Sequence, residues 1–400
     1  MKLTHRSTIL AGFFGYVTQS ITLNFSSLLY VTFGRQYGLS YSQISSLIVI
    51  CFLAQLLTDF IATKFPSFFK PRPTVILAQL VAALGVAGFG FLPRLLPPFA
   101  ALAVAVILSG FGSGLVEVMV SPVVEACPTK RKSAIMCLLH SFYCWGHVLV
   151  VLLSMLYFSL FGVEKWEYLA YFWALVPLFD MILFCFVPLF ETESEESKKE
   201  PHAFMKNKTF WLIFLVMLGG GASELAMSQW ASAFAETGLG MSKTLGDLLG
   251  PCLFAIFMGS ARLVYAKISH RISLNRFMTA SCALCIFSYL LAALAPLPAL
   301  AFVGCALCGL SVGIMWPGSL SYAKELIPMG GVSMFALLAL GGDIGCLLGP
   351  PTVGVIAEAF GNNLRISFLF SAIFPALMLI ALFFLSKKQP QKQPHTTPQK

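Results

Sequence analysis

Long apolar stretches recur along the whole chain and are separated by short polar loops. Runs such as Ala100 to Leu108 are apolar on every face, which suits a helix in lipid and not the alternating pattern of a membrane β-strand. We therefore expect an all-α polytopic membrane protein with twelve transmembrane helices. The predicted spans lie near 7–33, 41–63, 73–93, 98–124, 133–161, 167–190, 209–236, 243–267, 273–293, 297–323, 331–358 and 364–386.

One long hydrophilic interruption divides these spans into two sets of six. It predicts an N-terminal bundle over 1–190, a cytoplasmic linker over 191–208, a C-terminal bundle over 209–386 and a disordered tail over 387–400. The loops after the second and eighth spans support an internal repeat, because Asp59 and Arg262 each stand five residues before a lysine, Lys64 and Lys267. Two parallel repeats would place a substrate site between the bundles, near the middle of the bilayer.

Composition agrees with a membrane protein and leaves no room for a soluble catalytic domain. The chain is 58% hydrophobic and 11% charged, with a mean hydropathy of +0.84. Its net charge of +9 reflects topology, since 20 of the 26 lysines and arginines fall in loops on the side of the termini, and five fall on the other side. We expect a multi-pass protein of the inner (plasma) membrane with both termini cytoplasmic, and no nucleic-acid partner.

Cofactor and metal chemistry find little support in the sequence. The eleven cysteines lie almost entirely in predicted spans, where small residues commonly serve helix contacts. No phosphate-binding loop of the Gly-x-x-x-x-Gly-Lys-Ser/Thr type is present, which argues against an ATP-driven pump. We expect no metal, no cofactor and no enzymatic activity.

Acidic residues inside spans are costly and therefore point to function. Glu117 lies in mid-span on a stripe with Gly110, Gly114 and Ser121, and Asp343 lies in a glycine-rich segment of span 11. Burial disfavours the charged form of a carboxyl group, so such an acid can take up and release protons. Proton coupling is one interpretation of these two residues. The other interpretation of Glu117 is a protonated side chain bonded to a neighbouring helix, and Asp343 could instead pair with Arg262.

Several polar and aromatic residues are candidates for substrate binding. Sugar hydroxyl groups need hydrogen-bonding partners, and the apolar face of a sugar ring packs well on an aromatic side chain. Glu224, Gln229 and Trp230 supply both within two turns of span 7. Trp316 precedes a proline in span 10, and Asn24 belongs to a polar stripe in span 1. Interfacial tryptophans and polar contacts between helices are the alternative interpretation. Asp180, alone in span 6, indicates no mechanism.

Three motifs resemble the major facilitator superfamily, and within it the branch of the fucose:proton symporters. They are Gly114-Leu-Val-Glu117-Val-Met-Val-Ser121-Pro122, Leu139-His140-Ser141-Phe142-Tyr143-Cys144-Trp145-Gly146, and Gly313-Ile-Met-Trp316-Pro317. The resemblance implies a proton-carrying role for Glu117, sugar contacts from His140 and Tyr143, and a working monomer. Ser27 stands where the branch has an acid in helix 1, and Ser121 replaces an asparagine of the branch.

The loop signature between spans 2 and 3 of the superfamily survives only in part, and it suggests a conformational gate. We expect gating by Asp59, Lys64, Arg262 and Lys267, through ion pairs that hold the outward-facing state. We therefore expect a secondary active transporter that moves a sugar or related polyhydroxylated solute by proton symport. Its partners would be the solute, protons and membrane lipid. A proton-driven exporter of amphipathic drugs is the first alternative, and a membrane sensor or enzyme the second.

Overall fold

The computed structural model describes residues 4–65, 68–129, 132–190, 203–268, 272–327 and 331–387. These segments are helical nearly throughout, and eleven helices among them are long and apolar enough to cross a membrane. Most of the predicted linker, residues 191–202, and the tail from residue 388 lie outside the described residues. The all-α polytopic fold predicted from hydropathy is confirmed.

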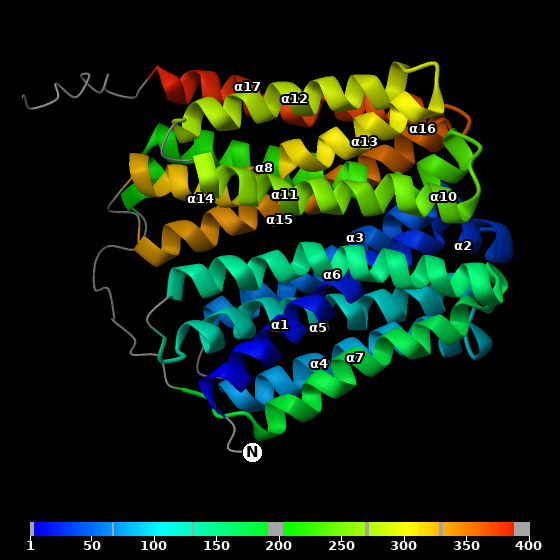
Figure 1. Ribbon diagram of the computed structural model, residues 1–400, viewed down its shortest axis with the longest axis horizontal. Coiled ribbons are helices and arrows are strands. Elements are labelled where there is room, and N and C mark those ends of the chain that lie inside the picture. Colours follow the sequence, from blue (N-terminus) through cyan, green and yellow to red (C-terminus); the bar gives the residue numbers. More distant parts are fainter. Residues whose placement is uncertain are drawn as a thin grey trace, which may run out of the picture.

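The N-terminal bundle occupies the lower half of Figure 1, in blue to green. Its α1 is absent from the eleven because buried polar residues, Gln19 and Asn24 among them, lower its hydropathy. A 3₁₀ turn at Ser26–Leu29 then divides the predicted first span into two helices. The helices of this bundle are α1 (His5–Asn24), α2 (Tyr30–Tyr37), α3 (Tyr41–Lys64), α4 (Pro71–Phe91), α5 (Pro98–Glu125), α6 (Lys132–Phe161) and α7 (Trp166–Phe186).

The C-terminal bundle forms the upper half of Figure 1, in green to red, and contains more broken spans. Span 10 is interrupted between α13 and α14, and π-helical turns at Phe234–Gly238 and Leu248–Cys252 interrupt spans 7 and 8. The helices are α8 (Lys208–Ser228), α9 (Ala231–Ala233), α10 (Lys243–Asp247), α11 (Leu253–Ile268), α12 (Leu274–Leu294), α13 (Pro298–Val312), α14 (Met315–Leu326), α15 (Gly331–Ala359), α16 (Leu364–Ser371) and α17 (Ile373–Ser386).

Small residues bring the helices of each bundle close together. In the pair of α4 and α5, a Cβ atom added at Gly112 would lie 2.6 Å from the backbone nitrogen of Ala82, so only glycine fits. Between the bundles, α3 packs against α15 and α6 packs against α11. These two helix pairs enclose the central region in which the sequence predicts a site.

The bundles are joined at the end of the molecule that carries α2 and α10, opposite the start of α1 and the end of α17 (Figure 1). The Tyr30 hydroxyl donates to Gln229 Oε1 at 2.7 Å, and Gln229 Nε2 donates to the Leu23 carbonyl at 3.0 Å. Arg35 forms an ion pair with Glu236 at 2.8 Å. We call this set, together with the bond at 2.7 Å from the Ser42 amide to Glu358, the α10-side contacts. They close the space between the bundles at this end.

Candidate functional site

A cavity of about 540 Å³ lies between the two bundles. Its wall extends from Leu23 and Leu225, next to the α10-side contacts, to Tyr265 and Ser321, near the opposite ends of their helices. His140 lies about two turns inside α6 and not at the start of the helix, and it is nevertheless exposed to solvent. The lining residues are Tyr16, Gln19, Leu23, Phe52, Gln55, Glu117, His140, Tyr143, Glu224, Leu225, Arg262, Tyr265, Ile314, Trp316, Pro317, Gly318, Leu320, Ser321, Asp343 and Cys346.

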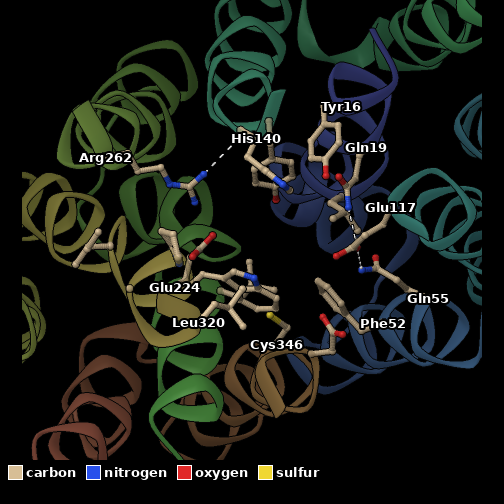
Figure 2. Close-up of a pocket in the computed structure, with 18 of the residues that line it drawn as sticks. Tyr16, Gln19, Phe52, Gln55, Glu117, His140, Glu224, Arg262, Leu320 and Cys346 are labelled. Carbon is tan, nitrogen blue, oxygen red and sulfur yellow. Dashed lines mark hydrogen bonds between the residues drawn. The ribbon is translucent and has the colours of Figure 1, made fainter. Parts of the chain in front are cut away.

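Glu117 stands at the centre of the wall contributed by the N-terminal bundle (Figure 2). One of its carboxyl oxygens, Oε2, accepts a hydrogen bond from Gln19 Nε2 of α1 and another from Gln55 Nε2 of α3, each at 2.9 Å. One turn further along α5, Ser121 is hydrogen-bonded to the Tyr16 hydroxyl at 2.8 Å. The acid is thus held by two amides from separate helices while its side chain faces the cavity.

Acidic residues from both bundles gather near Glu117. Asp343, on α15, lines the same cavity, and Asp59 lies one turn beyond Gln55 on α3, the helix that packs against α15. The three acidic residues thus come from three helices, α3, α5 and α15.

The opposite wall, from the C-terminal bundle, carries Glu224, Arg262 and Trp316. Glu224 and Arg262 bring one acidic and one basic side chain to the same wall. The Trp316 indole lies directly against Gly342, where a Cβ atom would overlap its ring. The absence of a side chain at residue 342 therefore allows an aromatic surface to stand in the cavity wall.

Arg262 also compensates for the break in span 10. Pro317 has no amide hydrogen, so the carbonyl of Gly313, four residues earlier, lacks its usual helical partner. Arg262 Nε donates to this carbonyl at 3.1 Å, and Nη1 donates to the His140 carbonyl of the other bundle at 3.4 Å. Figure 2 shows the second bond crossing between the bundles. Arg262 thus stabilises the bent span and links the two halves.

Not every predicted site residue reaches the cavity. Gln229 and Trp230 are almost fully buried at the α10 end, where the Trp230 indole nitrogen donates to the Pro350 carbonyl at 2.9 Å. Asn24 lies behind the wall and donates to the Tyr143 hydroxyl at 3.4 Å. Of the predicted gating residues, Arg262 lines the cavity, whereas Asp59, Lys64 and Lys267 do not.

Sequence reasoning missed part of the wall. Gln55 is an amide in an otherwise apolar stretch of α3, one turn before Asp59, and this spacing is a signal that could have identified it. Phe52 lies one turn earlier on the same face. Tyr265, near the end of α11, has no distinguishing pattern in the sequence.

The model of the Major Facilitator Superfamily matches residues 8–333 of this chain. The chain belongs to this superfamily. The match covers all of the N-terminal bundle's helices except the first three residues of α1, and most of the C-terminal bundle. The protein is therefore a secondary transporter of the major facilitator type, which binds a small-molecule substrate, and it is not an enzyme.

Solved structures of other transporters share this fold at low sequence identity. The nucleoside transporter NupG is 13% identical, with a TM-score of 0.76 and coverage of 97% of this chain and 100% of that one. A bacterial homologue of the human lysosomal transporter Spinster, in an inward-facing and occupied conformation, is 14% identical, with a TM-score of 0.76 and coverage of 97% and 98%. No curated protein sequence is detectably similar.

The resemblance to the fucose:proton symporters holds at the level of the superfamily. The E. coli fucose:proton symporter is 14% identical to this chain, with coverage of 96% of this chain and 99% of that one, and a TM-score of 0.64. This TM-score is lower than that of the nucleoside transporter. Likeness of fold therefore does not select the fucose branch, and the substrate must be argued from the cavity itself.

Proposed function

We propose that this major facilitator protein is a proton symporter for a sugar or a related polyhydroxylated solute. The observation that carries the proposal is the setting of Glu117, a carboxyl group in the cavity wall held by Gln19 and Gln55 from two other helices. A proton on Glu117 removes a charge from the space between the bundles. The protonated, loaded protein can then close and reopen on the other side, since moving a buried charge is costly.

The shape of the molecule supports alternating access in an inward-facing state. The basic loops predict that the end with both termini is cytoplasmic, in the inner (plasma) membrane. The α10-side contacts would then close the outer side, while the cavity wall extends toward Tyr265 and Ser321 on the inner side. We take the two bundles, 1–190 and 209–386, as the rocking units of a working monomer.

The cavity suits a solute of the size of a sugar. A volume of about 540 Å³ lies in the range of small-molecule sites. Glu224, His140 and the two glutamines offer acceptors and donors for hydroxyl groups, and Trp316 offers a flat apolar face. Tyr143 would contact the substrate, and Asn24 would orient the Tyr143 hydroxyl from behind the cavity wall. Gln229 and Trp230 are assigned to the α10-side closure instead.

Asp343 is the second acid of the proposed coupling, because it faces the cavity from the other bundle. Arg262 acts in gating, since its bond to the His140 carbonyl must break when the bundles separate. Asp59, Lys64 and Lys267 remain gate candidates at the ends of α3 and α11.

Uptake into proteoliposomes tests the proposal. Purified protein is reconstituted, an inward proton gradient is imposed, and labelled hexoses, deoxyhexoses and sugar acids are supplied outside. We expect at least one of these solutes to accumulate above its external concentration, and a protonophore to abolish the accumulation. Limited proteolysis of the loops, which needs no substrate, verifies that the protein is inserted in the liposomes. If it is inserted and none of the solutes accumulates, sugar symport is refuted.

A drug exporter is the second candidate, and the aromatic lining favours it. Tyr16, Phe52, Tyr143, Tyr265 and Trp316 all face the cavity, and such surfaces accommodate amphipathic molecules. Export predicts that protons moving into the cell drive the clearance of a fluorescent amphipathic cation from cells that express the protein. Symport predicts no such clearance, together with uptake of sugar.

Replacing Trp316 with alanine is expected to raise KM for the transported solute. An aromatic face contributes about 1 kcal/mol to ring contacts, which corresponds to about a fivefold loss of affinity. Trp316→Phe should recover part of this loss because it retains a ring. The initial rate of uptake over a range of solute concentrations measures the effect. Unchanged KM in the alanine variant would show that the indole is part of the wall without binding the solute.

A further inference from the structure

A second acidic group is buried inside the N-terminal bundle, away from the cavity. Asp180 on α7 has no solvent exposure, and neither has Gln79 on α4, which faces it. Gln79 Nε2 donates to Asp180 Oδ2 at 2.7 Å. Neither residue belongs to the cavity wall, and the transport mechanism uses neither.

Each of the two side chains retains one oxygen without a partner. Asp180 Oδ1 and Gln79 Oε1 are both buried and accept no hydrogen bond from any described residue. An ionised carboxylate and an amide carbonyl can only accept, so these two oxygens cannot satisfy each other. A buried polar atom without a partner is destabilising, and two in one contact require an explanation.

Among the residues that the structure describes, no positive charge forms an ion pair with Asp180. On α4, the nearest cation is Arg72, two turns from Gln79, and its guanidinium donates to the carbonyls of Phe184, Cys185 and Val187. On α1, Gly15 faces the Asp180 carboxyl, and the next residue, Tyr16, has its hydroxyl bonded to Ser121.

The remaining charged and titratable groups are further away or otherwise engaged. Glu164 and Lys165 lie in the 3₁₀ turn before α7 and Glu167 in its first turn, about 20 Å from Asp180 along the helix. On α6, His140 lines the cavity and His147 is buried. On α5, Glu117 is held by its two glutamines. Within the described part of the chain, a carboxylate at Asp180 would therefore be a buried charge without a counterion.

We propose that Asp180 binds a proton permanently and forms a neutral carboxyl–carboxamide pair with Gln79, separate from the transported proton. With the proton on Oδ1, this atom becomes a donor toward Gln79 Oε1, while Oδ2 continues to accept from Gln79 Nε2. Both orphaned oxygens then have partners, and no charge is buried. The site stabilises the contact of α4 with α7 and does not take part in coupling.

The variant Asp180→Asn tests this assignment directly. An asparagine amide has one donor group and one acceptor group, as a protonated aspartic acid has, although its NH2 group carries a second hydrogen, whereas a carboxylate has two acceptors. We expect the Tm of purified Asp180→Asn to equal that of the wild type near neutral pH. Gradient-driven uptake should also be unchanged. The Tm of Asp180→Ala should fall by about 5 °C or more, because Gln79 then loses both partners and a void remains.

The pH dependence of Tm separates a bound proton from a merely structural residue. The folded wild type holds a proton that the unfolded chain releases, so its Tm should fall as the pH rises. Asp180→Asn has no such proton, and the difference in Tm between variant and wild type should grow in favour of the variant at alkaline pH. Infrared spectra should show a protonated carboxyl band in the wild type that this substitution removes.

Two results would overturn the proposal. If Asp180→Asn destabilises the protein as strongly as Asp180→Ala, the native group is a carboxylate. If sodium or another monovalent cation raises the Tm of the wild type, and this rise is lost in Asp180→Asn, the two oxygens bind a metal cation in place of a proton.

Discussion

Replacing Glu117 with glutamine is expected to abolish accumulation of the solute against its gradient while exchange of solute across the membrane continues. A glutamine side chain has nearly the same size, and its carbonyl oxygen can still accept the bonds from Gln19 and Gln55. The cavity should therefore persist and bind solute. The side chain cannot carry a proton, however, so the proton gradient is no longer linked to transport.

The size of this effect follows from thermodynamics. A proton gradient of one pH unit stores about 1.4 kcal/mol per proton, which sustains about tenfold accumulation of a solute moved with one proton. For Glu117→Gln we expect a ratio of inner to outer concentration close to one, and wild-type rates of counterflow. Glu125→Gln is the matched control, because Glu125 is exposed at the end of α5 and should behave as the wild type. Wild-type accumulation in Glu117→Gln would transfer the coupling role to Asp343, which Asp343→Asn then tests.

Hydropathy predicted the all-helical fold and its membrane spans well because each span sums a preference over about 20 residues. The breaks within spans were less accessible to sequence reasoning. Pro317 predicts a bend in span 10. The bend leaves the carbonyl of Gly313 without a helical partner, and Arg262 donates to that carbonyl. The end of α1 at Asn24 has no proline nearby, and there polar side chains bond to the backbone of the preceding turn.

Single charged residues in a bilayer were also predictable as site candidates, since their cost demands a function. The partners of those residues were not, because pairing depends on three-dimensional neighbours. Gln55 and Glu117 lie 62 residues apart in the chain and form a hydrogen bond between two helices.

Trp230 and Gln229 were predicted as site residues but lie outside the cavity. An aromatic ring beside an amide suits both a sugar and a closed helix contact, and only the packing against Tyr30 and Pro350 distinguishes the two.

In the proposed alternating access the α10-side contacts form and break, and Gly354 on α15 lies where α15 approaches α3 at this end. A Cβ atom at Gly354 would overlap the Ser45 hydroxyl of α3 and lie 2.8 Å from the Trp230 ring and 3.0 Å from the Tyr41 carbonyl. Ser45 and Tyr41 belong to the other bundle, so the overlap with these two residues arises only when the bundles meet at this end. The contact with Trp230 lies within the C-terminal bundle, so glycine at residue 354 serves the packing of that bundle as well as the meeting of α3 with α15.

Gly354→Ala should therefore hold the protein open at the α10 end and reduce transport at least about tenfold, since even 1.4 kcal/mol against closure shifts the equilibrium by that factor. Spin labels at the exposed Leu96 and Leu297, in the loops of the two bundles at this end, should report a longer distance in the variant, in a cysteine-free background. Gly259→Ala is the matched control. Its added methyl group also faces the other bundle, but lies 3.5 Å from Cys144 Cβ, an ordinary contact. An unchanged distance distribution in Gly354→Ala, with normal uptake, would show that α3 and α15 can meet without this close approach.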